Sequence, residues 1–260
     1  MRSISFELKS KKRKRRALKA AGLIGAAFFL IAGLYIVSGL KVWKIETIAV
    51  EGAFRVGTEQ IKEIARAELA SRYLKIISKA NIFLYPKGRI KTELFKSFPA
   101  IKDVKVSREN LHGIVISVEE RAPQALWCDN EDDCYFIDET GFIFLEAGGP
   151  NDIYVVFSGG LSGEPIGHYL VEQSKYREIN SFLSELSGLG LEPRAFAIAS
   201  SSGDVSIRTE TYGDLLLNES VGYERSLAAL QSVLPEIILS SRPLSYIDLR
   251  FPQKAFYKFK

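Results

Sequence analysis

The chain has 260 residues, of which 47% are hydrophobic and 25% are charged. This length and composition allow one or two domains with buried cores, and they exclude a wholly disordered protein. The formal net charge is +4, but residues 1–40 hold nine Lys and Arg against one Glu, which leaves residues 41–260 at 4 − 8 = −4. A basic surface for nucleic acid is therefore not expected outside the N-terminal tail.

The N-terminus combines a basic tail, residues 1–19, with an uncharged stretch, residues 20–40. As a helix the twenty-one uncharged residues would extend about 31 Å, the thickness of one bilayer core. A cleavable signal peptide is the alternative, but its apolar region is usually only ~7 to 15 residues long. We therefore expect a single transmembrane helix, with the basic tail in the cytoplasm and everything after Lys41 outside.

The next segment predicts the element order strand, helix, helix, strand, strand. A strand is expected within Lys44–Phe54, and a helix is expected from Thr58, the predicted N-cap. A second helix should end at Pro99, and a hairpin should follow within Phe98–Pro123. The apolar positions on which these predictions rest are Ile48 and Val50, then Ile61, Ile64, Ala65 and Leu69, then Ile90, Leu94 and Phe95, and finally Val104, Val106, Ile114, Ile116 and Val118.

The two cysteines, Cys128 and Cys134, flank a run of acidic and amide residues between two expected strands. A disulfide is the favoured interpretation, because these residues would lie outside the membrane in an oxidising compartment. Two free thiols or a metal site are the alternatives. The spacing lacks the paired Cys-x-x-Cys form of a zinc site, and Asp129 to Asp133 lacks the pattern of a helix-loop-helix calcium site.

The rest of the chain predicts a mixed, mostly antiparallel sheet with two amphipathic helices. One helix is marked by Tyr176, Ile179, Leu183 and Leu186, and the other by Tyr223, Leu227, Leu230 and Leu234. The two histidines, His112 and His168, both lie in loops that contain glycine, and no nucleophile elbow or phosphate-binding loop accompanies them. We predict no catalytic residue, no metal site and no cofactor.

Several segments, taken in order, resemble the FtsQ/DivIB family of cell division proteins, whose outer part begins with a POTRA domain. These are IETIAVEG, NIFLYPKGRI, FPAIKDVKVSR and IVISVEERAPQALW, followed by YFIDETGFIF, GDLLLNESVGYERSLAALQSVL and YIDLR. The resemblance implies an α+β protein with a POTRA domain at residues 44–121 and a β-rich partner-binding domain at residues 122–260.

The resemblance also implies a function. FtsQ/DivIB proteins are non-enzymatic scaffolds of the septum in the cell (inner) membrane. Their partners are small coiled-coil bitopic proteins of the FtsB/DivIC and FtsL type, and the POTRA domain contacts other membrane proteins of the divisome. A membrane-anchored hydrolase or transferase of the cell envelope, with an unrecognised site, is the alternative function.

The partner-binding site is predicted on a C-terminal strand, Ser245 to Tyr257, which is rich in aromatic residues and contains Pro252. Proline fits an edge strand or the end of a strand better than a central strand, and an exposed edge can pair with a strand from a partner. In the family, the aromatic residue after Asp-x-Arg belongs to the partner-binding surface, and Phe251 occupies that position here. The predicted contact residues are Tyr246, Leu249, Phe251, Gln253, Phe256 and Tyr257. The alternative is that these aromatic residues complete the core.

Overall fold

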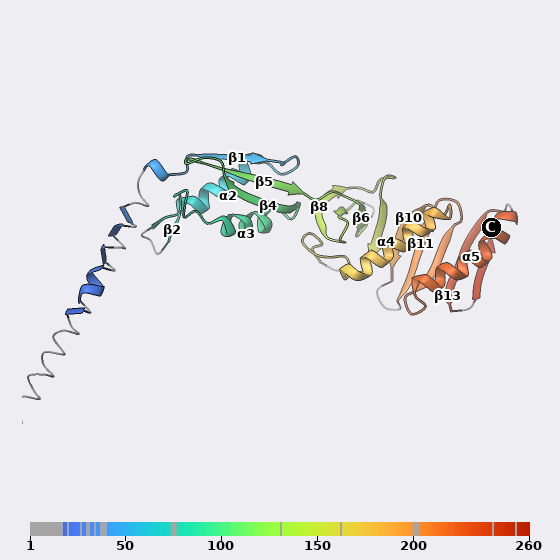
Figure 1. Cartoon of the computed structure of the whole chain (residues 1–260). Helices are drawn as coiled ribbons and strands as arrows, with labels where there is room; N and C mark the ends of the chain where they lie inside the picture. Colours follow the sequence, from blue (N-terminus) through green and yellow to red (C-terminus); the bar gives the residue numbers. More distant parts are fainter. Residues whose placement is uncertain are drawn as a thin grey trace, which may run out of the picture. The chain divides into compact units, whose positions relative to one another are not determined.

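The computed structural model describes residues 18–19, 21–26, 28–29, 32–33, 35–36, 41–73, 77–130, 132–161, 163–199, 203–240, 242–252 and 254–260. Contacts within the chain divide it into two compact units, Met1–Glu120 and Arg121–Lys260 (Figure 1). Each unit has its own sheet and its own helices.

The N-terminal tail, residues 1–17, and parts of the predicted span at residues 20–40 lie outside the described residues. The described residues between 18 and 36 are helical, and their apolar side chains, including Leu23, Phe28 and Phe29, are exposed. Within the described part of the chain, no helix is both long and apolar enough to cross a membrane.

The first unit confirms the predicted order strand, helix, helix, strand, strand. Its sheet has the order β1-β5-β4, in which β1 is parallel to β5 and β5 is antiparallel to β4. The elements are the 3-10 helix η1 (Lys41–Trp43), β1 (Thr47–Glu51), α2 (Thr58–Ala70), β2 (Arg72–Tyr73), β3 (Ile77–Ser78), α3 (Lys87–Ser97), β4 (Ile101–Arg108) and β5 (Gly113–Glu120). The short pair β2–β3 between the helices was not predicted, because two-residue strands carry too little pattern to detect.

The helix α2 begins one residue earlier than the predicted cap implied. Thr58 is the first helical residue, and Gly57, in extended conformation, is the N-cap without a side-chain hydrogen bond. The predicted apolar stripe is largely correct, because Ile61, Ala65 and Leu69 are buried. In the same way, Ile90 and Leu94 of α3 are buried. The two helices therefore supply the hydrophobic core that the three-stranded sheet needs.

The loop between β1 and α2 is held by Glu120, the last residue of β5. Its carboxylate accepts backbone N–H groups of Phe54, Arg55 and Val56 at 2.9–3.0 Å. Gly52 begins this loop with φ +78°, and a Cβ there would collide with the carbonyl oxygen of Val118. The loop is thus fixed against the end of β5 by three amides and one carboxylate.

Replacing Glu120 by Ala should release this loop. Hydrogen bonds to a charged acceptor contribute about 1.5–3 kcal/mol, so we expect a loss of roughly that size in the stability of the first unit. Amide hydrogen exchange at residues 54–56 should accelerate. Glu119→Ala is the matched control, because the Glu119 side chain is exposed and pairs with Lys102 at 3.3 Å on the surface. Equal exchange rates in the two variants would contradict this role for Glu120.

The described residues of the second unit form one nine-stranded sheet and two helices (Figure 1). The sheet order is β14-β13-β12-β11-β10-β9-β6-β7-β8, and three of its eight neighbouring pairs are parallel. The elements are β6 (Ala125–Cys128), β7 (Cys134–Ile137), β8 (Ile143–Gly148), β9 (Val155–Gly159), α4 (Gln173–Gly188), β10 (Pro193–Ile198), β11 (Asp204–Thr209), β12 (Asp214–Asn218), α5 (Tyr223–Ser240), β13 (Leu244–Phe251) and β14 (Lys254–Phe259). The structure is the α+β fold with a mixed sheet that the sequence indicated.

The helices α4 and α5 pack on one face of this sheet and contact each other. All four residues that predicted α4 are buried, and of those that predicted α5 only Leu227 remains half-buried. The alternating strands place their second set of side chains on the opposite face, which we call the open face. Around β6 and β7 the open face has a smaller apolar cluster of its own, with Leu126 at its centre.

The turn after β7 is built around Asp138, whose side chain is fully buried. One carboxylate oxygen, Oδ1, accepts the backbone N–H and the hydroxyl of Thr140 at 2.8 and 2.6 Å and the N–H of Phe142 at 3.1 Å. The other, Oδ2, pairs with Arg121, whose guanidinium lies 4.2 Å from the centre of the Phe142 ring. Asp138 therefore joins Arg121, the first residue of the second unit, to the turn between β7 and β8.

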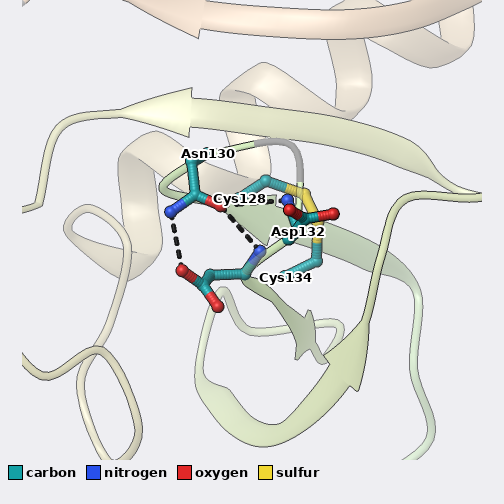
Figure 2. Close-up of a disulfide and its surroundings, with 5 residues drawn as sticks. Cys128, Asn130, Asp132 and Cys134 are labelled. Atoms are coloured by element: carbon teal, nitrogen blue, oxygen red, sulfur yellow. Dashed lines mark hydrogen bonds between the residues drawn. A yellow bond between two sulfur atoms is a disulfide. The ribbon is translucent and has the colours of Figure 1, made fainter.

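Cys128 and Cys134 lie opposite each other in the register of β6 and β7, and a disulfide joins them. Figure 2 shows the turn that this bridge closes. The side-chain oxygen of Asn130 accepts the N–H groups of Asp132 and Asp133, both at 2.9 Å, and its amide donates to Asp133. The acidic run is thus a hairpin turn organised by an asparagine.

We expect the native, unreduced chain to be lighter than the reduced chain by the mass of two hydrogen atoms. Neither Cys128 nor Cys134 should be alkylated before reduction. The closed loop is short, so the bridge should contribute only about 2–3 kcal/mol to the stability of the second unit. Mass spectrometry of alkylated, non-reduced chain checks this prediction. Two alkyl groups added under native conditions would contradict it.

Candidate partner-binding site

The C-terminal segment is a hairpin, which corrects the prediction of one strand from Ser245 to Tyr257. Phe251 of β13 pairs with Lys254 of β14, and Pro252 lies in a turn directly after β13. Proline has no N–H and a fixed φ, and Pro252 therefore ends the strand where the aromatic pattern suggested that it continued. Gln253, one of the predicted contact residues, lies outside the described residues.

The edge strand is β14, while β13 lies between β12 and β14. Among the described residues, β14 pairs with β13 alone. The N–H of Lys260 donates to the carbonyl of Pro243 across this pair at 2.9 Å. Because amide directions alternate along a strand, the N–H groups of Ala255, Tyr257 and Phe259 point away from β13. They are the donors that a further strand could use.

Two of the predicted contact residues point toward the helices instead of the open face. Leu249 is fully buried in the main core, so it supports the hairpin and is not available to a partner. Tyr257 is half-buried against the same core, and its hydroxyl bonds to the Glu236 carboxylate of α5, which raises the pKa of Tyr257. For these two positions the structure agrees with the alternative that they complete the core.

The open face brings together Phe251 and Phe256, which are 48% and 50% exposed. Their rings meet edge to face with centroids 5.4 Å apart. Tyr246, partly exposed, lies in register with Lys258 of β14 and Asp214 of β12. An exposed aromatic pair beside an edge strand offers an apolar anchor next to free backbone donors.

Next to Phe251, the end of β13 carries a charged pair, Asp248 and Arg250. Arg250 donates from its Nε and Nη2 atoms to the two carboxylate oxygens of Asp248, at 2.9 and 2.7 Å. This side-chain hydrogen bond is the main cause that lowers the pKa of Asp248. The Arg250 guanidinium also lies 3.8 Å from the carboxylate of Asp204 on β11. The arrangement fixes the end of β13 from which Phe251 projects.

The edge strand itself is basic. Lys254, Lys258 and Lys260 lie within the last seven residues, which include no acidic residue. Lys254 and Lys258 are exposed and share the open face with Phe256. An acidic strand of a partner would be complementary to this edge. The sequence prediction did not count these lysines or Ala255 among the contact residues, although their alternation with Phe256 and Tyr257 is visible in the sequence.

Replacing Phe251 by Ala should weaken partner binding while the fold remains. We expect the Kd for a small coiled-coil partner of the FtsB/DivIC type to rise at least about fivefold, which corresponds to about 1 kcal/mol. The ring is half exposed, so its loss should change the circular dichroism spectrum little. Phe54→Ala is the control, because Phe54 is 90% exposed in the first unit. Equal binding by both variants would remove Phe251 from the site.

The histidines are placed in separate units. The carbonyl of His112 accepts N–H groups of Glu46 and Thr47, and the N–H of His168 donates to Pro165. Across the described part of the chain, no three His, Cys, Asp or Glu side chains gather as a metal would require.

Comparison with known proteins identifies the first unit. The family profile described as POTRA domain, FtsQ-type, matches residues 43–121, which cover the segment from Trp43 of η1 to the end of β5. No curated protein matches the chain. The chain therefore contains an FtsQ-type POTRA domain, and a β-rich C-terminal region follows it.

Proposed function

We propose that this protein is a bitopic scaffold of the bacterial divisome, of the FtsQ/DivIB type, that holds other division proteins at the septum. The observation that carries the proposal is the FtsQ-type POTRA domain at residues 43–121, placed between an apolar segment and a nine-stranded sheet. Domains of this type are generally non-catalytic. The two parts of the outer region are then the POTRA domain, residues 44–121, and a partner-binding domain, residues 122–260.

The apolar segment at residues 20–40 anchors the protein in the cell (inner) membrane. Support comes from its uncharged sequence and from the exposed apolar side chains of its described residues. The basic tail, residues 1–19, stays in the cytoplasm under the positive-inside rule, and both units lie outside. Protease added to spheroplasts should digest the two units and leave the tail intact.

The second unit binds its partners at the β14 edge and the Phe251–Phe256 pair. The partners are small coiled-coil bitopic proteins of the FtsB/DivIC and FtsL type. A segment of such a partner pairs with β14 and extends the sheet by one strand. Acidic residues in that segment face the lysines of β14. The POTRA domain contacts other membrane proteins of the divisome.

A fluorescently tagged full chain tests the proposal in dividing cells. It should concentrate at mid-cell during constriction, and the purified chain should leave peptidoglycan intact in a zymogram. A tagged chain that never gathers at mid-cell would contradict the division role. Cleared peptidoglycan would instead favour the envelope hydrolase.

A further inference from the structure

One end of the POTRA domain carries a group of exposed apolar side chains around η1. We call it the juxtamembrane surface and define it by Val42, Trp43, Phe83, Leu84 and Leu111. Val42, Phe83, Leu84 and Leu111 are 58%, 56%, 40% and 50% exposed, and Trp43 is half-buried. Burying such a set of side chains would be favourable, so their exposure indicates that another molecule or a membrane covers this surface.

The surface is held together by backbone pairing between distant segments. The N–H of Ile82 donates to the carbonyl of Trp43 at 2.8 Å, and Lys44 forms a bridge with Asn81. The Trp43 and Phe83 rings meet edge to face with centroids 5.1 Å apart. The hairpin tip joins them, because the carbonyl of His112, next to Leu111, accepts the N–H of Glu46 at 2.7 Å. These contacts hold the segments that carry Phe83 and Leu111 at the same end of the POTRA domain as Trp43.

Two basic residues accompany the apolar ones. The Arg108 guanidinium lies 5.3 Å from the centre of the Phe83 ring, and Lys44 is exposed beside Trp43. Glu46 and Glu109 are also exposed nearby, so the surface is mixed in charge. Aromatic rings with a cationic partner suit the bilayer interface, where one end of a side chain is apolar and the other is hydrated.

The position of the surface in the chain identifies its occupant. Trp43 is three residues after Leu40, the last residue of the apolar segment, and three residues reach at most about 11 Å. The polar layer on each side of a bilayer is itself about 5–8 Å thick. If residues 20–40 span the membrane, as the proposed function requires, Trp43 lies in or just above that layer. Phe83, which contacts Trp43, must lie there too.

We propose that the juxtamembrane surface rests in the lipid interface, so that the POTRA domain is bound to the bilayer by its own side chains and not only tethered to it. Trp43 and Phe83 enter the polar layer beside Leu84 and Leu111, and Arg108 and Lys44 contact lipid phosphates. The contact restricts the tilt of the POTRA domain on the membrane. This inference rests on the transmembrane span of the proposed function.

The test uses the full chain reconstituted in phosphatidylcholine vesicles with bromine atoms on the acyl chains close to the headgroup, which quench tryptophan. The chain has two tryptophans, and Trp127 is buried in the second unit, so a Trp43→Phe background leaves Trp127 alone as a constant signal. In that background, F83W places a reporter on the surface. F54W is the matched control, because Phe54 lies beyond β1, a strand about 16 Å long that leads away from η1.

We expect the brominated lipid to quench F83W at least twofold more than F54W. In the native chain, Trp43 should be quenched as well, which provides a readout without substitution at Phe83. If the chain floats with the vesicles but F83W and F54W are quenched equally, or neither is, the lipid contact of this surface is wrong while the span remains. A chain that does not float with the vesicles would overturn the span, and this inference with it.

Discussion

Asp138→Ala is expected to destabilise the second unit by about 3–5 kcal/mol, the typical cost when one partner is removed from a buried ion pair. The Asp138 carboxylate is fully buried and accepts three hydrogen bonds from Thr140 and Phe142 besides its pair with Arg121. Alanine removes the acceptor for all of them and leaves Arg121, whose side chain is only 16% exposed, without this carboxylate.

Urea unfolding of the full chain in detergent measures this effect. In a Trp43→Phe background, the fluorescence of Trp127 reports the second unit alone, because Trp127 is 2% exposed within its core. Asp138→Asn should cost less, since the amide oxygen can still accept from Thr140. Asp132→Ala, at an exposed position of the neighbouring hairpin, should change stability by less than about 0.5 kcal/mol. An Asp138→Ala variant as stable as Asp132→Ala would show that the buried pair does not hold this turn.

Ala255→Pro is expected to abolish strand addition at β14 while the hairpin remains. The N–H of Ala255 points away from β13, so proline removes a donor that the sheet itself does not use. The ring also occupies the space where a partner strand would approach. We expect the Kd of a small coiled-coil partner to rise at least about tenfold, or about 1.4 kcal/mol.

Ala255→Val is the matched control, because valine also adds apolar volume at this position and keeps the N–H. It should bind the partner as the unchanged chain does, and both variants should retain the circular dichroism spectrum of the folded second unit. Proline and valine variants that bind equally well would place the partner elsewhere than on this edge. Because Ala255 packs against the main core, the valine variant also controls for added volume. An unfolded proline variant beside a folded valine variant would contradict the expectation that the sheet does not use the N–H of Ala255.

Regular amphipathic elements were predictable from the sequence. The stripe of Tyr176, Ile179, Leu183 and Leu186 predicted α4, because a 3.6-residue period sustained over a long segment is typical of a helix with one buried face. The alternation in Ile114, Ile116 and Val118 predicted β5, because a two-residue period is typical of a strand. The resemblance to FtsQ/DivIB proteins supplied what periodicity could not, namely that the five predicted elements between Lys44 and Arg121 form a POTRA domain, and the family profile agrees.

The C-terminal hairpin was harder to predict, because neighbouring strands decide which face and which edge a residue occupies. The aromatic run suggested one strand, but Pro252 and the pairing of Phe251 with Lys254 make it two. Register then separates Phe256 on the open face from Tyr257 on the helix side. Leu249 is buried for a similar reason, since β13 lies inside the sheet and one of its faces is covered by α5. These are long-range contacts that the local pattern does not contain.

Amide hydrogen exchange of the full chain, with and without a small coiled-coil partner of the FtsB/DivIC type, tests partner binding at β14 most directly. The amides of Ala255, Tyr257 and Phe259 should exchange rapidly alone and become protected in the complex, because they would then donate to the added strand. The amides of Phe256 and Lys258, which point toward β13, should change little. Protection that develops at other segments while Ala255, Tyr257 and Phe259 keep exchanging rapidly would contradict the scaffold function as proposed for this edge.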